Sequence, residues 1–137
     1  MLEEFGLQLI RLDLPFRLNH VNCFLAEGTD GYTVIDTGLH NKETVERWER
    51  ELEGKEVTNL IVTHYHPDHF GYAGGFQQKY GVDVSMTKVD AENGINAWEH
   101  ELLSKLDSYY TLSGIPEDID REMVENTKEF IPRVNPY

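Results

Sequence analysis

Three histidines and an aspartate stand within six residues of this chain. Residues 64–69 read His-Tyr-His-Pro-Asp-His and directly follow an apolar run, residues 59–63, that has the composition of a buried strand. Imidazole nitrogen and carboxylate oxygen are ligands for Zn²⁺ and other first-row metals. Histidines this close repel one another when charged and are costly to bury when neutral. A bound metal removes both costs, so we expect a metal site rather than a histidine-rich surface loop.

The spacing of these residues predicts how they are used. Pro67 prevents a helix from starting before it and holds His66 extended. Asp68 and His69 then fall at a turn or in the first residues of a helix. We expect His64 and His66 to face one metal, and Asp68 and His69 to face a second. Two neighbouring metals would orient a substrate and lower the pKa of a bridging water toward ~7.

The pattern His64-x-His66-x-Asp68-His69, followed by Gly71, resembles the signature of the metallo-β-lactamase superfamily. A second likeness lies upstream in residues 32–38, a strand-like run that ends in Asp-Thr-Gly. The resemblance implies that Asp36 lies beside the metal loop and orients a ligand or the loop backbone. Taken alone, Asp36 would be read as a helix-cap or turn residue.

The resemblance implies a metal centre with two zinc ions, or with iron or manganese in their place. Its ligands would be the three histidines and Asp68, and Asp68 would also orient the nucleophile. Family members draw a further histidine, a bridging aspartate and a final histidine from a second half. After His69 this chain offers only His100, within a helical pattern. We therefore expect the N-terminal half of a longer enzyme, inactive alone. A partner chain that completes the site, or a fragment without chemistry, are the alternatives.

The expected fold class is α/β, as half of an αββα metallo-β-lactamase-type sandwich with a mixed sheet, flanking helices and a C-terminal helical segment. Strands are expected at 5–14, 21–27, 31–36, 59–63 and 82–86, with a hairpin at Asp30-Gly31. A helix capped by Asn41 should bury Val45, Trp48 and Leu52, and a second should run from 71 to 81. The strand–helix alternation favours largely parallel pairing.

Residues 1–90 are expected to form this half-domain and residues 91–137 a helical insertion or cap. Ile95, Trp98, Leu102, Leu106 and Tyr109 recur at helical spacing, and Pro116 should start a further helix. This segment either lies over the active site or packs against the sheet. His100 is expected to be a helix residue, and His20 and His40 strand-end and loop residues.

Composition excludes several partners. With a formal charge of −13 over 137 residues, nucleic acid and anionic membranes are not expected to bind. Cys23 is the sole cysteine, which excludes an intrachain disulfide and favours a small buried side chain. Neither a signal peptide nor an apolar membrane span is evident, so the expected location is cytoplasmic.

The function expected from these features is hydrolysis of a small molecule by metal-activated water. The resemblance allows an ester, thioester, lactone, lactam or phosphoester, and a thioester or other small acyl ester is preferred because a cytoplasmic setting disfavours antibiotic resistance. A non-catalytic metal-binding or interaction module, and an iron-dependent oxidoreductase of the same fold, are the alternatives. Sheet surface left exposed should cause self-association into a homo-oligomer.

Overall fold

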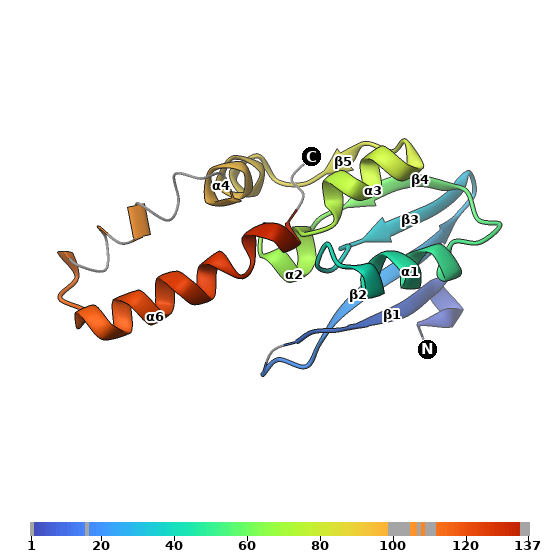
Figure 1. Ribbon diagram of the computed structural model, residues 1–137. Coiled ribbons are helices and arrows are strands. Elements are labelled where there is room, and N and C mark those ends of the chain that lie inside the picture. Colours follow the sequence, from blue (N-terminus) through green and yellow to red (C-terminus); the bar gives the residue numbers. More distant parts are fainter. Residues whose placement is uncertain (1, 16, 99–104, 107, 109–111, 135–137) are drawn as a thin grey trace.

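The chain forms a five-stranded mixed sheet in which the strands lie side by side in sequence order (Figure 1). The computed structural model describes residues 2–15, 17–98, 105–106, 108 and 112–134. The strands are β1 (Leu7–Asp13), β2 (His20–Gly28), β3 (Gly31–Ile35), β4 (Val57–Ile61) and β5 (Val84–Ser85). The helices are α1 (Lys42–Glu51), α2 (Pro67–Phe70), α3 (Ala73–Tyr80), α4 (Lys88–Trp98) and α6 (Glu117–Lys128), with 3-10 turns η1 (Glu3–Phe5) and η2 (Ile131–Arg133).

The pairing of the strands confirms the expected α/β class with a mixed sheet, but the expectation of largely parallel pairing is wrong, because the first two of the four pairings are antiparallel. Strands β1, β2 and β3 form an antiparallel meander, whose second turn places Gly28 opposite Gly31. Strands β3, β4 and β5 are parallel, with α1 as the first crossover and α2 and α3 as the second. Because β3 and β4 run in the same direction, their carboxyl ends meet at one edge of the sheet. The residues that follow these two strands are therefore brought together.

One face of the sheet is buried under α1 and α3. Trp48 of α1 and Phe76 of α3 are fully buried, and their rings meet edge to face with centroids 5.6 Å apart. Cys23, on β2, is also fully buried, as expected. Burial raises the pKa of its thiol, and the negative charges of Asp36 and Asp68 raise it further. The thiol is thus a small core side chain.

The opposite face carries an apolar row. Leu9, Phe24, Ile35 and Ile61 pair in register across four strands. Leu9 and Ile61 are 45% and 41% exposed, and the two central side chains are partly buried. This set of four residues is called the apolar row below.

The structure shifts some expected boundaries. Strand β4 ends at Ile61 rather than at Thr63, because the backbone N–H of Thr63 donates to a side chain, the carboxylate of Asp36. Strand β5 is only two residues long, because it pairs only with the last two residues of β4. The histidine-proline turn forms its own short helix, α2, so the next helix begins at Ala73 rather than Gly71.

The C-terminal segment begins with helix α4, which starts at Lys88 and runs across the expected boundary between residues 90 and 91. His100, Leu102 and Tyr109 lie outside the described residues. Helix α6 follows Pro116, as expected. No helix in the described ranges is long and apolar enough to cross a membrane.

Three segments meet at Gly71, directly after α2. A Cβ atom at this position would lie 2.4 Å from the carbonyl oxygen of Pro67, 2.7 Å from that of Arg133 and 2.9 Å from that of Gly38. All three are backbone atoms, which cannot move aside as a flexible side chain can. Because glycine has no side chain, the histidine loop (residues 64–69), the Asp-Thr-Gly loop (residues 36–38) and the turn η2 can pack together at this position.

We expect Gly71→Ala to lower the free energy of unfolding by about 3 kcal/mol or more, because the added methyl overlaps backbone atoms. The control is Gly81→Ala. Gly81 has a φ of 68° with no atom near its virtual Cβ, so only about 1–2 kcal/mol of left-handed strain is expected there. Urea unfolding measures both values. Equal losses in the two variants would contradict the close packing at Gly71.

Candidate metal-binding site

The histidine loop has the backbone that its sequence predicts. His66 is extended, with φ −61° and ψ 145°, and Pro67 occupies the first turn of α2. The N–H groups of His69 and Phe70 both donate to the carbonyl of His66, which closes this turn. Asp68 and His69 therefore lie in the first turn of a helix, and His64 and His66 lie in the loop before it.

The four proposed ligands are neighbours in space. The ring centroids of His64 and His69 are 4.1 Å apart, and those of His64 and His66 are 4.6 Å apart. Nε2 of His69 lies 3.5 Å from Oδ2 of Asp68. The two pairs expected from the spacing thus form one continuous cluster, in which His64 and His69 are the closest rings.

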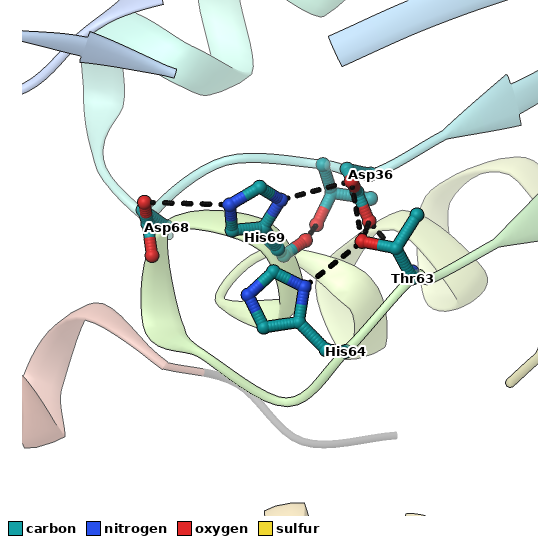
Figure 2. Close-up of polar contacts among 6 residues, drawn as sticks. Asp36, Thr63, His64, Asp68 and His69 are labelled. Atoms are coloured by element: carbon teal, nitrogen blue, oxygen red, sulfur yellow. Dashed lines mark hydrogen bonds and ion pairs between the residues drawn. The ribbon is translucent and has the colours of Figure 1, made fainter. Parts of the chain in front are cut away.

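Asp36 joins the cluster from the end of β3. It is the single residue other than glycine with positive φ among the described residues, at 62°. Its N–H donates to the carbonyl of Ile61, so this bend is held against the end of β4. Oδ2 of Asp36 lies 2.8 Å from Nδ1 of His69, and Oδ1 accepts from the N–H of Thr63 at 2.8 Å (Figure 2). The carboxylate thus contacts both a candidate ligand and the loop backbone.

The proton on His64 can be placed by counting donors. Oγ of Thr63 contacts both carboxylate oxygens of Asp36, at 3.0 and 2.8 Å, and also lies 3.0 Å from Nδ1 of His64 (Figure 2). An ionised carboxylate only accepts, and a hydroxyl has one proton. That proton goes to Asp36, so Thr63 must accept from Nδ1–H of His64.

The same reasoning places a proton on Nδ1 of His69, because this atom faces the carboxylate of Asp36, which can only accept. In the neutral state both histidines then carry their proton on Nδ1, and the lone pair of each Nε2 is available. This is the protonation state in which imidazole binds a metal through Nε2. Thr63, which motif reasoning did not single out, is the link between Asp36 and His64.

Charge and burial act differently on these groups. Burial disfavours the charged form of Asp36, but hydrogen bonds from His69 and Thr63 outweigh it and lower the pKa. Burial also opposes a charge on His69, but Asp36, followed by Asp68, raises its pKa above the usual 6.5. Burial and the neighbouring His69 and His66 lower the pKa of His64. His64 is therefore neutral, and competent as a ligand, at lower pH than His69.

The core holds the loop through the residues after Asp36. The N–H and hydroxyl of Thr37 both donate to the carbonyl of His69, at 2.9 and 3.0 Å. Nε1 of Trp48 in turn donates to the carbonyl of Thr37 at 2.8 Å. Trp48 is thus a core residue, as expected, that also fixes the Asp-Thr-Gly loop against the histidine loop.

Helix α4 contacts the histidine loop from its other side. Nε1 of Trp98 donates to the carbonyl of Tyr65 at 3.1 Å, and a Cβ on Gly94 would lie 3.1 Å from Cβ of Tyr65. The start of the C-terminal segment therefore packs beside the candidate site. His20 bonds to Asn19 at the start of β2 and His40 stacks on Tyr72, so the two contact side chains outside the cluster.

The cluster fits a transition metal in the kind of its donors, but the ligand set is partial. Among the described residues, no group of three or more His, Cys, Asp or Glu side chains is arranged to hold a metal ion. Structural and catalytic zinc sites use three or four protein ligands. The metal-binding role of the loop thus stays a prediction, and the hydrogen bonds that orient His64 and His69 are its main support.

Comparison with known proteins identifies the family. The sequence model of the metallo-beta-lactamase superfamily matches residues 17–136. The chain belongs to this superfamily. The match extends past residue 90, so the likeness is not confined to the first 90 residues. No curated protein sequence matches the chain.

Solved structures of metallo-beta-lactamase proteins share the fold. A metallo-beta-lactamase family protein from Thermus thermophilus is 28% identical, with a TM-score of 0.76, and a beta-lactamase domain protein from Burkholderia ambifaria is 25% identical, with a TM-score of 0.72. The alignments cover 96% of this chain but 43% and 41% of those chains. A metallo-beta-lactamase from Pontibacter korlensis, 23% identical with a TM-score of 0.56, aligns over 70% of this chain and 45% of its own. The chain thus spans about two-fifths of the length of the first two.

Asp36→Asn tests the electrostatic arrangement, because it removes the charge that raises the pKa of His69. We expect the pKa of His69 to fall, followed by NMR titration of the imidazole resonances. Asp30→Asn, in the exposed hairpin, is the control and should leave that pKa unchanged. A pKa of His69 that is the same in Asp36→Asn and wild type would contradict the arrangement.

The same variant should change the pH dependence of stability. Because folding raises the pKa of His69, the protonated ring stabilises the folded chain at pH values below 6.5, its usual pKa. This stabilisation is lost as the pH rises through the pKa of the folded state. Because folding lowers the pKa of Asp36, the ionised carboxylate stabilises the folded chain at pH values above 3.8, its usual pKa. This stabilisation is lost as the pH falls through the pKa of the folded state. Asp36→Asn should therefore lose most stability, relative to wild type, between about pH 4 and pH 6.5. Urea unfolding at several pH values measures the difference.

Proposed function

We propose that this chain contributes to the centre of a metal-dependent hydrolase, of the type with two zinc ions. The proposed ligands are His64, His66, Asp68 and His69. The observation that carries the proposal is the hydrogen-bond arrangement around Asp36, which leaves Nε2 of both His64 and His69 as acceptors. Bound zinc would lower the pKa of a coordinated water toward ~7 and polarise a substrate oxygen.

The proposal gives each side chain a separate task. Asp36 orients His69 directly and His64 through Thr63, so it positions ligands without touching the reacting atoms. Asp68 faces Nε2 of His69, which is the side of the ring left open for a ligand. We assign Asp68 to hold a cation beside Nε2 of His69 and to orient the nucleophile at that cation. Further ligands are needed to reach the usual coordination number.

We propose an acyl substrate, either a thioester or another small ester, in a cytoplasmic setting. A hydroxide nucleophile suits esters, thioesters, lactones, lactams and phosphoesters alike. The chain has 25 acidic and 12 basic residues, so its overall field opposes a strongly anionic substrate. Iron in place of zinc, with an oxidoreductase activity, is the alternative for the same ligands.

Zinc titration with a chromophoric competitor tests the metal site directly. We expect His66→Ala and Asp68→Ala each to weaken zinc binding by about tenfold or more, because each removes a proposed ligand. His20→Ala is the matched control, since His20 lies outside the cluster, and it should bind zinc as the wild type does. Equal affinity in all four proteins would exclude the loop as a metal site. Turnover of a thioester and of a phosphodiester by the same samples separates a hydrolase from a metal-binding module.

We also propose that the apolar row causes self-association. The row presents four aligned apolar side chains, two of them at least 41% exposed. Exposed apolar surface of this kind usually finds a partner. Ile61→Arg should weaken self-association by about tenfold or more, as measured by sedimentation equilibrium. Val89→Arg, at an exposed apolar position on α4, is the control. A wild-type chain that stays monomeric at high concentration would contradict this proposal.

A further inference from the structure

A cavity of about 550 Å³ lies outside the histidine cluster and is lined by four arginines. Arg11 comes from β1, Arg47 and Arg50 come from α1, and Arg133 comes from η2. Its lining includes no residue of the histidine loop and does not include Asp36. Three segments that are distant in the sequence thus place arginines around one hollow.

The charge of this cavity is opposite to that of the chain. It gathers four of the twelve lysines and arginines of a chain whose net charge is −13, and only two acidic residues, Asp13 and Glu43, share the lining. Nε of Arg47 lies 2.8 Å from Oε1 of Glu51. In the described part of the chain, the side chains of Arg11 and Arg50 have neither a hydrogen-bond nor an ion-pair partner. Like charges brought together repel, and an anion would relieve this repulsion.

The elements around the cavity are fixed by contacts that do not use the guanidinium groups. Asn41 caps α1 by accepting from the N–H of Thr44 at 2.8 Å. The carbonyl of Arg133 accepts from the N–H of His40 at 2.7 Å, which ties η2 to the loop before α1. The backbone frame is thus formed without a ligand, and the heads of Arg11 and Arg50 are available to bind one.

We propose that this cavity binds the phosphate group of a small phosphate monoester. Guanidinium groups match tetrahedral oxyanions with paired, charge-assisted hydrogen bonds, and a doubly charged phosphate balances the two positive charges of Arg11 and Arg50, whereas one carboxylate balances only one of them. The volume lies within the range of small-molecule sites. The site is separate from the proposed hydrolytic centre, so its test is independent of the metal chemistry.

Isothermal titration calorimetry of the whole chain tests the proposal, at fixed ionic strength because these contacts are screened by salt. The probes are glycerol 3-phosphate, inorganic phosphate and succinate. We expect saturable binding of glycerol 3-phosphate that is tighter than binding of succinate. Arg11→Gln and Arg50→Gln should each weaken it by about tenfold, whereas Arg17→Gln, an exposed arginine outside the lining, should leave it unchanged.

Two comparisons decide the outcome: the stability of the variants against that of the wild type, and the binding of inorganic phosphate against that of glycerol 3-phosphate. Both substituted arginines are exposed, so the variants should keep the circular dichroism spectrum and unfolding midpoint of the wild type. Binding of inorganic phosphate as tight as that of the monoester would support the phosphate site and assign the ligand as phosphate itself. No saturable binding, an equal loss in Arg17→Gln, or tighter binding of succinate would each overturn the proposal.

Discussion

The carboxylate of Asp36 is the group on which the candidate site depends. It accepts from the N–H and hydroxyl of Thr63 and faces Nδ1 of His69. Asp36 makes these contacts from a left-handed backbone, which an aspartate tolerates better than most residues. The strain is compensated by three hydrogen bonds to a charged acceptor, the strong class of such bonds. With that acceptor in place, the neutral forms of His64 and His69 both carry their proton on Nδ1.

The order of the strands in the sheet places the carboxylate of Asp36 beside the histidine loop. Strands β3 and β4 are parallel neighbours, so the residues following them, Asp36 and Thr63, emerge at the same edge. Trp48 fixes the Asp-Thr-Gly loop by a hydrogen bond to Thr37. Gly71 lets the histidine loop pack directly against it, because glycine has no side chain. The core and the site are therefore linked, and packing defects beneath the loops should disturb the ligand geometry above.

The sequence predicted the parts of this arrangement that are local. The histidine spacing and Pro67 determine the loop backbone, and the alternation of strands and helices indicates the mixed sheet. The family resemblance also predicted that Asp36 lies beside the histidine loop. The individual partners in contacts between distant segments were not predictable, because periodicity carries no information about which side chain meets which. The bond between Thr63 and Asp36 spans 27 residues, the bond from Trp98 to Tyr65 spans 33, and the arginine cavity joins residues from both ends of the chain.

The most direct test of the account is long-range ¹H–¹⁵N NMR of the histidine rings near pH 8, with and without one equivalent of zinc. The account predicts that neutral His64 and His69 both carry their proton on Nδ1, and that zinc shifts the Nε2 resonances of both rings. Protons on Nε2 in the metal-free chain, together with Nε2 resonances that zinc leaves unchanged, would contradict it.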